Sequence, residues 1–397
     1  MKYIFTLLFF CFSTLWADEP LPWLHAQKTA IVDEKGSSVI LRGVNLGGWL
    51  QEEMWMLPFV REAPSNSDYT EILDHVSLWR TFEKRFGKEK MHEIRKSYRN
   101  TWLTHIDFAN IKAAGFNVVR LPFLYDLQNH PEGLFYWLDR AVELAQKNGL
   151  YVILDLHGAP GRQGNHEHTG ESNKDEFFKN HAHINKTCEI WKEIAHHYKD
   201  CSAVAGYDLL NEPTGAPSSK ELYKITDRLY KAVRSEDKKH LIFIEDGYKG
   251  ISKMPHPKEF KWENIVMSTH FYVFEENTTD EFLKKFHEHL KGVEDKQNKS
   301  QVPYYLGEFN VAPRGSLETM KRVLSVLHEK KLSYSFWTYK IGRRGHKNSL
   351  WGIYYAPGNQ KNIDPFRDSH KDILKKIERL HSKNYEKNRD LIHHFKN

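Results

Sequence analysis

Cysteine is scarce in this chain, with three among 397 residues. Cys11 lies in an apolar N-terminal segment, which leaves Cys188 and Cys201 for the rest of the chain. A helical pattern runs from Cys188 to Tyr198 and separates the two by about 15 Å of helix. A disulfide needs Cα atoms within about 7 Å of each other. We therefore expect two buried thiols, no disulfide, and a fold that depends on an apolar core.

The chain also lacks low-complexity segments, sequence repeats, dense basic blocks and long hydrophobic runs beyond its first residues. Mean hydropathy is −0.66, and charged residues of both signs make up 28% of the chain. These values exclude a polytopic membrane protein, a collagen and a disordered chain. The net charge of +6 is modest, and Lys and Arg alternate with Asp and Glu, so no nucleic-acid partner is expected. Only the stretch from Lys371 onward is rich in Lys and His, and it is typical of a solvated helix.

The N-terminus has the pattern of an export signal. Lys2 precedes an apolar run over residues 3–12, and a small residue, Ala17, stands before a polar segment. We predict a signal peptide over residues 1–17 and one catalytic domain over 18–397, with a mature charge of 57 − 52 = +5. The protein would then be secreted, periplasmic or extracellular, without stable membrane insertion. The alternative is an uncleaved anchor, although the run is short for a membrane span.

Short apolar runs alternate along the chain with amphipathic helical patterns. The strand candidates cover residues 39–45, 117–122, 151–157, 205–211, 241–246, 265–270, 304–309 and 334–339. The helical candidates cover residues 103–114, 134–148, 175–198, 218–235, 280–293, 316–330 and 368–382, the last as the eighth helix. Residues 247–264 are expected to be mostly loop. Strands that are apolar throughout are typical of parallel sheets covered on both faces.

Eight strand–helix units favour an α/β fold of the (β/α)8 (TIM) barrel type, as a single domain. Residues 51–100 form an enlarged insertion after the first strand, and we expect its helical part, residues 72–98, to pack over the top of the barrel. The alternative is a doubly wound open sheet. Its G-x-G-x-x-G turn is missing, because residues 43–48 read GVNLGG.

Polar and aromatic side chains stand at the end of nearly every predicted strand. They are Asn45, Arg120, His157, Asn211, Glu212, Glu245, His270, Tyr272, Glu308 and Trp337. Any one of them alone is more often a salt-bridge, capping or core residue. Burying so many polar groups without mutual hydrogen bonds would be costly, and barrel enzymes place their chemistry at the C-terminal ends of strands. The simplest interpretation is one converging site.

Glu212 and Glu308 end the fourth and seventh strands and can face each other across the barrel axis. Two carboxylates that face each other across a cleft are what glycoside hydrolysis requires. The nucleophile must stay ionised, for which Arg120 is the available cation, and the acid must keep its proton. Retention would require the two carboxyl groups to lie about 5–5.5 Å apart.

A metal site was considered as an alternative because the chain has 23 His residues, among them His166, His168, His181 and His183. A metal-dependent barrel hydrolase would place a His-x-His pair at the end of strand one, which here ends Asn45-Leu-Gly-Gly. We therefore expect neither metal nor cofactor.

The motifs resemble glycoside hydrolase family 5, within clan A of the retaining (β/α)8 glycosidases. Asn211-Glu212-Pro213 is similar to the acid/base motif of the family, and Leu306-Gly-Glu-Phe309 to its nucleophile motif. The first-strand stretch Arg42–Trp49 resembles the fungal exo-β-1,3-glucanase subgroup. The pair His166 and His168 departs from that subgroup, because it stands where an aromatic clamp is expected.

The resemblance implies a role for each matching residue. Glu308 would be the nucleophile and Glu212 the acid/base, supported by Arg120, Asn211, His270 and Tyr272. Substrate binding would involve His157, Trp337, Glu53, Asn45 and Trp49, with Trp55 and Trp351 as further candidates for sugar stacking. Glu52 adjoins Glu53, so the carboxylate assigned to the terminal sugar could be either.

The sequence therefore predicts a secreted, monomeric retaining β-glycosidase that acts on β-glucan or oligosaccharides, most similar to exo-β-1,3-glucanases. Alternatives with the same catalytic pair are a β-1,4-glucanase, a glycolipid β-glycosidase and a transglycosylase. A non-catalytic carbohydrate-binding barrel is a further alternative, although it would not need both carboxylates.

Overall fold

Eight parallel strands close into a barrel in the order β10-β3-β4-β5-β6-β7-β8-β9. The computed structural model describes residues 20–275, 278–343 and 349–396, so the predicted signal segment 1–17 lies outside the described residues. The strands are β3 (Arg42–Asn45), β4 (Val118–Leu124), β5 (Tyr151–Gly158), β6 (Val204–Asp208), β7 (Leu241–Glu245), β8 (Ile265–Phe271), β9 (Tyr304–Phe309) and β10 (Ser333–Phe336). Each overlaps a predicted strand, and the barrel is confirmed.

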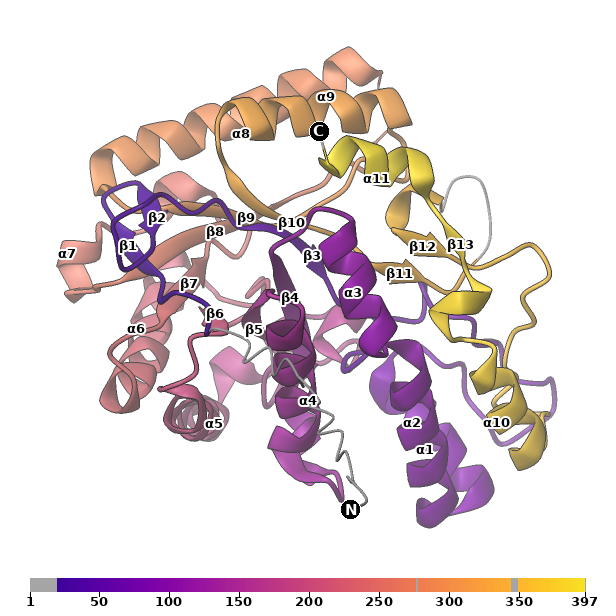
Figure 1. Cartoon of the computed structure of the whole chain (residues 1–397). Helices are drawn as coiled ribbons and strands as arrows, with labels where there is room; N and C mark the ends of the chain where they lie inside the picture. Colours follow the sequence, from indigo (N-terminus) through magenta and orange to yellow (C-terminus); the bar gives the residue numbers. More distant parts are fainter. Residues whose placement is uncertain (1–19, 276–277, 344–348, 397) are drawn as a thin grey trace, which may run out of the picture.

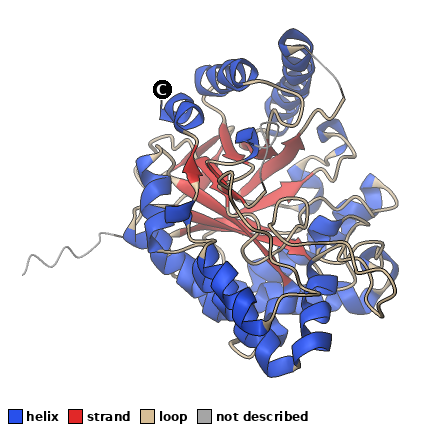
Figure 2. Ribbon diagram, turned by 90° about the vertical axis from the view of Figure 1, so that its right-hand side faces the viewer, coloured by secondary structure: helices blue, strands red, loops and turns tan. Residues whose placement is uncertain are grey.

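Helices surround the strands on the outside (Figures 1 and 2). Those between consecutive strands are α3 (His105–Ala113), α4 (Gly133–Lys147), α5 (His181–Tyr198), α6 (Ser219–Glu236), α8 (Thr279–Ser300) and α9 (Leu317–Glu329). Side-chain caps define where several of them begin: Ser218 accepts a hydrogen bond from the Glu221 amide, and Thr278 pairs with Glu281 in a capping box. The β7–β8 connection is mostly loop, as predicted, with one short helix, α7 (Pro257–Phe260).

The eighth helix of the barrel is not the predicted one. Helix α10 (His370–Glu378) packs against α2 (Lys88–Trp102) of the insertion, and the place beside α9 belongs to α11 (Arg389–Lys396) (Figure 1). The ring of Phe395 packs against Phe336 of β10 and Phe116. The C-terminal stretch is therefore not a fully solvated helix, because α11 buries an apolar face on the barrel.

The insertion after β3 contains two helices rather than one. Helix α1 (His75–Phe86) ends at Gly87, whose φ of 80° favours glycine, and α2 follows directly. Trp102 donates a hydrogen bond to the Gly47 carbonyl (3.1 Å), which ties α2 to the loop after β3. No described residue of α1 or α2 lines the cavity at the barrel mouth. Both helices do pack against loops at this end of the barrel, because the Tyr98 hydroxyl donates to the Gly48 carbonyl and the Val76 amide to the Gly170 carbonyl. The irregular segment that precedes α1, which includes Glu53 and Trp55, lines the cavity.

The N-terminal end of the barrel is closed by an apolar plug. The hairpin of β1 (His25–Gln27) and β2 (Ala30–Val32) contributes Ile31, which with Leu24 packs on the lower layer of side chains inside the barrel. The lower layer includes Leu41, Val118, Ile153 and Phe243. The polar interior is thereby confined to the opposite, C-terminal end of the strands.

Both remaining cysteines, Cys188 and Cys201, are free, as predicted, but they are half-buried rather than fully buried. No helix within residues 20–275, 278–343 and 349–396 combines the length and apolar character needed to cross a membrane. A small sheet of β11 (Lys340–Ile341), β12 (Tyr354–Tyr355) and β13 (Glu386–Lys387) joins the segment after β10 to the C-terminal region.

Candidate active site

A cavity of about 620 Å³ opens at the C-terminal ends of the barrel strands. Its lining residues come from most of the β–α loops: Glu53, Trp55, His157, His166, His168, Glu212, Thr214, Tyr248, Tyr272, Phe274, Glu308, Pro313, Trp337 and Trp351. The size, and titratable side chains that converge among aromatic walls, are typical of a small-molecule site. The cavity contains both predicted catalytic carboxylates.

Glu212 follows β6 in a strained turn. Its φ of 41° is in the left-handed region, which non-glycine residues rarely adopt. Its backbone N–H donates a hydrogen bond of 2.7 Å to Glu245 Oε2, at the end of β7. This bond from a neighbouring strand helps to hold the turn, so the side chain points into the cavity.

Glu308 lies in β9 and is held on both oxygens. Arg120 Nη1 donates to Oε1 and the Tyr272 hydroxyl donates to Oε2, each at 2.8 Å. Charge-assisted hydrogen bonds of this kind fix the orientation of a carboxylate as well as its charge. The predicted support of Glu308 by Arg120 and Tyr272 is therefore present in the structure.

Arg120 is fully buried in the centre of a ring of acids. Besides Glu308, its guanidinium lies within 3.1 Å of oxygens of Asp155, Asp208 and Glu245. One cation cannot balance four buried carboxylates. Burial and the neighbouring acids raise the pKa of Asp155 to about 8 and that of Asp208 well above its ordinary value, although Arg120 opposes both shifts. These two acids are thus protonated near neutral pH, and they satisfy Arg120 without adding full charges.

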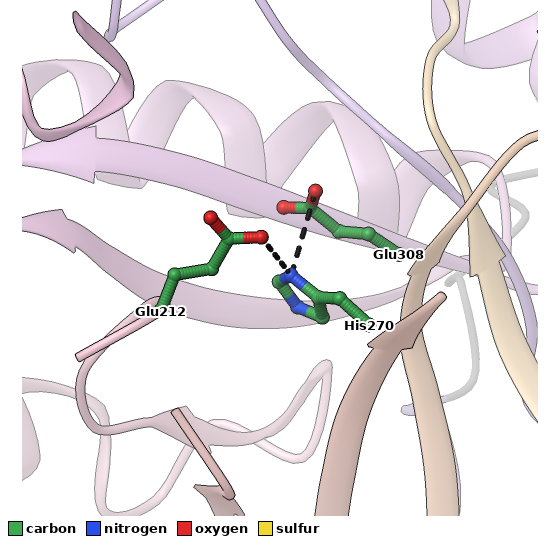
Figure 3. A group of neighbouring side chains, drawn as sticks. All are labelled: Glu212, His270 and Glu308. Atoms are coloured by element: carbon green, nitrogen blue, oxygen red, sulfur yellow. Dashed lines mark hydrogen bonds and ion pairs between the residues drawn. The ribbon is translucent and has the colours of Figure 1, made fainter. Parts of the chain in front are cut away.

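His270 connects the two catalytic candidates (Figure 3). Its Nδ1 lies 2.7 Å from Glu212 Oε1 and 3.6 Å from Glu308 Oε2. Burial lowers the pKa of His270, but Glu245, Glu308 and Glu212 overcome this effect and raise it well above its usual range. His270 is therefore an imidazolium that donates to Glu212.

The sequence predicts that Glu308 stays ionised and that Glu212 keeps its proton. The pKa values of the two glutamates shift in the opposite directions. Burial raises the pKa of Glu308, and His270 and Arg120 reduce the rise without reversing it. Burial also raises that of Glu212, but the imidazolium of His270 and the hydrogen bond from Tyr248 oppose burial, and the pKa of Glu212 lies below the ordinary value. Because His270 contacts both carboxylates, the three groups exchange protons as one unit rather than independently.

The same three residues are the one group that could hold a metal ion among the described residues, since one potential ligand atom from each lies within 4.8 Å of the others. A protonated Nδ1 cannot bind a metal, and His270 donates from that nitrogen to Glu212. The donor set therefore fits a hydrogen-bonded acid–base unit better than a metal centre.

His157 and Trp337 form one wall of the cavity. Their rings are stacked with centroids 5.6 Å apart and an interplanar angle of 17°. His157 Nδ1 lies 2.6 Å from Asp155 Oδ2, and burial lowers the pKa of His157 to about 4. A neutral, oriented imidazole beside a flat indole is suited to sugar hydroxyls and the C–H face of a sugar ring.

Glu53, and not the adjacent Glu52, faces the cavity. Glu53 Oε2 accepts a hydrogen bond of 2.6 Å from the Trp55 indole, and its buried Oε1 has no hydrogen-bond partner among the described residues. Burial and Glu167 raise its pKa well above the ordinary value. Glu52 is instead buried with His75 and Arg99.

Two predicted substrate contacts are wrong. Trp49 is fully buried, packs against Phe108 and Trp137, and donates its indole N–H to the Arg99 carbonyl at 2.8 Å. It cannot stack on a sugar because it does not reach the cavity. Asn45 is also fully buried and accepts a hydrogen bond from Arg120 Nη1 at 3.1 Å, so it acts on the site through that arginine.

Asn211 is likewise buried beneath the cavity. Its side-chain oxygen accepts a hydrogen bond of 2.8 Å from Arg120 Nη2, and its amide nitrogen lies 3.4 Å from His157 Nε2.

Sequence reasoning missed two neighbours of Glu212. The Tyr248 hydroxyl donates to Glu212 Oε1 at 2.9 Å, and His168 Nε2 lies 3.5 Å from Glu212 Oε2. Tyr248 stands three residues after Glu245, so the position just beyond a strand end was the available signal. His168 was noticed as a departure from an aromatic clamp, and the loop that carries it cannot be placed by periodicity.

Comparison with known proteins agrees with this geometry. Residues 81–342 match the family model "Cellulase (glycosyl hydrolase family 5)". A β-xylosidase of Phanerodontia chrysosporium is 33% identical over 264 residues, which cover 64% of this chain and 52% of the relative. A probable glucan 1,3-beta-glucosidase A of Neosartorya fischeri is 30% identical over 286 residues, which cover 69% of this chain and 65% of the relative. The alignments thus span about half to two thirds of these relatives.

Solved structures share the fold. A rutinosidase from Aspergillus niger superimposes with a TM-score of 0.61 at 19% identity, covering 85% of this chain and 97% of that one. An endogalactoceramidase superimposes with a TM-score of 0.60 at 19% identity, covering 90% and 85%. The sequence match over most of the barrel and the site at its C-terminal end lead to one conclusion: this chain belongs to glycosyl hydrolase family 5.

Proposed function

We propose that the protein is a retaining β-glycosidase of β-glucans or their oligosaccharides, most similar in action to exo-β-1,3-glucanases. The observation that carries this proposal is the closeness of the two carboxylates, since an oxygen of Glu212 and one of Glu308 lie within 4.8 Å of each other. Retaining enzymes separate their carboxyl groups by about 5–5.5 Å, whereas inverting enzymes need about 6.5–9.5 Å to admit a water. The measured closeness supports retention.

In the first step, a Glu308 oxygen attacks the anomeric carbon and the bond to the leaving oxygen breaks. Glu212 takes up the proton that it shares with His270 and Glu308 and gives it to that oxygen, so the alcohol leaves neutral and the ionised Glu308 becomes a glycosyl ester. Arg120 and Tyr272 orient Glu308 for this attack through their 2.8 Å hydrogen bonds.

In the second step, Glu212 takes a proton from water while the water oxygen attacks the anomeric carbon and the ester bond breaks. The sugar leaves with its original configuration, and Glu212 is protonated again. Ester formation removes the charge of Glu308, which lowers the pKa of Glu212 and suits it to act as a base. His270, which contacts both carboxylates, stabilises the ionised form of Glu212.

Residues around the carboxylates provide the sugar contacts in this proposal. Trp337 offers an indole face below the reacting ring, and His157 binds hydroxyl groups. Glu53 Oε1, which is buried and unpartnered within the described residues, accepts a hydrogen bond from a further hydroxyl. Phe274, 61% exposed at the mouth, provides an apolar surface for the leaving group.

A β-1,3-glucosidic substrate is supported by the relatives named glucan 1,3-beta-glucosidases. An endo-acting glucanase is the second candidate, because a cavity of about 430 Å³ adjoins the first and shares Glu53, Trp55 and His166 with it. Such a continuation could accommodate sugars beyond Glu53. Hydrolysis of laminarin to glucose alone would favour exo action, and early release of longer oligosaccharides would favour the endo alternative.

We also propose export, based on the signal pattern of residues 1–17. N-terminal sequencing of protein from the medium or periplasm of the expressing cell should begin at Asp18.

The proposed function is tested by the products of laminaritriose, cellotriose, mannotriose and glucosylceramide, and by the anomer that ¹H NMR detects first. We expect β-glucose from laminaritriose. Glu308→Gln and Glu212→Gln should reduce its turnover at least about 100-fold, the scale of a lost catalytic group. Glu378→Gln, at an exposed position of α10, should leave turnover unchanged. First release of the α-anomer, or near-full activity of Glu308→Gln, would contradict the proposal.

A further inference from the structure

His168 lies at the cavity but has no part in the mechanism above. It belongs to a short 3-10 turn, η2 (Glu167–Thr169), and its side chain is 15% exposed. Its Nε2 atom is buried and finds no hydrogen-bond partner in the described parts of the chain. Glu212 Oε2 lies 3.5 Å from this nitrogen.

The two oxygens of Glu212 have different surroundings. Oε1 accepts hydrogen bonds from His270 Nδ1 (2.7 Å) and from the Tyr248 hydroxyl (2.9 Å). Oε2 has no such donor among the described residues and faces His168. Two donors already occupy Oε1, so Oε2 is the oxygen through which Glu212 can exchange a proton with the substrate.

The backbone fixes the position of His168. Gln51 Nε2 donates to the His168 carbonyl at 2.9 Å, and Thr169 Oγ1 donates to the His166 carbonyl at 2.9 Å. The turn ends at Gly170, whose φ of 95° requires glycine. The imidazole is therefore held beside Glu212 by a built turn.

The surroundings keep His168 uncharged at neutral pH. Burial, opposed by Glu212 and aided by the nearby imidazoles of His157, His166 and His270, lowers its pKa to about 4. A neutral imidazole can donate from a ring nitrogen or accept at it, depending on its tautomer. In the tautomer that carries its proton on Nε2, His168 can donate to Oε2 whether Glu212 is a carboxylate or a carboxylic acid. The proton on Oε2 of the acid then stays free for the substrate.

We propose that His168 is a positioning residue that holds Oε2 of Glu212 toward the glycosidic oxygen in both protonation states of the carboxyl group. This inference rests on the proposed function, in which Glu212 alternates between acid and base. The 3.5 Å separation is at the outer limit of a hydrogen bond, and such contacts shorten when substrate binds.

The test compares two substrates that depend differently on the acid. Laminaribiose has a poor leaving group that needs the proton from Glu212, whereas 2,4-dinitrophenyl β-glucoside does not need it. His168→Phe should lower kcat/KM for laminaribiose about tenfold and for the dinitrophenyl glucoside less than about threefold, because it weakens general acid catalysis alone. His168→Gln, whose amide lies near the position of Nε2, should recover most of the loss.

Two further variants complete the experiment. His168→Asn keeps an amide but is too short to reach Oε2, so it should resemble His168→Phe even if the latter folds poorly. His181→Phe, an exposed position at the start of α5, should match the wild type on both substrates. All variants are compared by circular dichroism and thermal melting.

The outcomes are distinct. Equal losses on both substrates in folded His168 variants, or an Asn variant as active as the Gln variant, would overturn the role of His168. A wild-type protein that cleaves neither substrate would overturn the proposed function instead.

Discussion

The hydroxyl of Tyr248 donates a hydrogen bond of 2.9 Å to Glu212 Oε1, from a loop two residues beyond the end of the fifth strand candidate. Tyr248 adopts a φ of 56°, and its neighbour Gly247 a φ of 57°. Two successive left-handed residues turn the ring back over the cavity. The tyrosine thereby stabilises the ionised form of Glu212.

Tyr248→Phe should therefore raise the pKa of Glu212. The lost donor favoured the carboxylate, so its removal favours the protonated acid and moves the alkaline limb of kcat/KM to higher pH. A hydrogen bond to a charged group contributes about 1.5–3 kcal/mol, so a shift of about one to two pH units is expected. A pH–rate profile with laminaribiose measures it, and an unmoved or lowered alkaline limb would show that Tyr248 does not tune Glu212.

Asp208 provides a test of the buried charges around Arg120. Its pKa lies well above the ordinary value because burial and Glu245 disfavour the anion. The unfolded chain releases this proton near pH 4, and the folded protein keeps it, so this group makes stability fall as pH rises above about 4. Asp208→Asn cannot titrate, and its stability relative to the wild type should increase between pH 4.5 and pH 7.

Urea unfolding at the two pH values measures that difference. Arg120→Met is the contrasting variant, since it leaves the carboxylates without their cation and should cost about 3–5 kcal/mol. A stability difference between Asp208→Asn and the wild type that is the same at both pH values would mean that Asp208 is ionised in the folded protein.

Lys340 should make the stability of the protein depend on pH with a sign opposite to that of Asp208. Its ammonium is buried, donates to the carbonyls of Trp102 and Leu380, and lies 4.5 Å and 4.4 Å from the ring centres of Trp102 and Tyr385. Burial lowers its pKa to about 7, against about 10.4 in the unfolded chain. Between these values the unfolded chain binds the extra proton, so the contribution of Lys340 makes stability rise with pH.

Lys340→Met should lose this rise. The free energy of unfolding of the wild type minus that of the variant should increase from pH 7 to pH 9.5, measured by urea unfolding, because all other titrating groups are common to both proteins. A constant difference would contradict the lowered pKa.

The strands and the place of the two glutamates in the cavity could be predicted from the sequence because each depends on a local pattern. An apolar run that ends in a polar residue is visible in the chain itself, and this pattern located Glu212, Glu308, Arg120 and His270. The same reasoning failed for Trp49, since a tryptophan near a strand end can point into the cavity or into the core. Only the packing of Phe108 and Trp137 around it decides which.

Residues on loops could not be placed for a related reason. Tyr248 and His168 reach Glu212 through turns whose paths depend on glycines and on distant hydrogen-bond partners such as Gln51. The pKa directions of Glu212 and Glu308 also depend on three-dimensional neighbours. Their sequence positions predict that the two carboxylates meet, but not which of them His270 stabilises more.

The eighth barrel helix was misassigned because two C-terminal segments have amphipathic helical patterns. Residues 370–378 bury Ile373 and Ile377 in a helix that packs on α2, and residues 389–396 bury Leu391, Ile392 and Phe395 in one that packs beside α9. Periodicity identifies a buried face without identifying its partner. A mutation can identify the partner.

Phe395→Ala should destabilise the protein by about 3–5 kcal/mol, because a phenyl ring that is 1% exposed would leave a cavity against Phe336 and Phe116 on the barrel wall. Arg389→Ala, at the exposed first residue of the same helix, should stay within about 0.5 kcal/mol of the wild type. Urea unfolding followed by tryptophan fluorescence compares the two. Since α11 packs on β10 and on Phe116, the loss should appear in the single cooperative transition of the barrel. A separate early transition in Phe395→Ala, with the main one unchanged, would show instead that α11 is an appendage and that the barrel is stable without it.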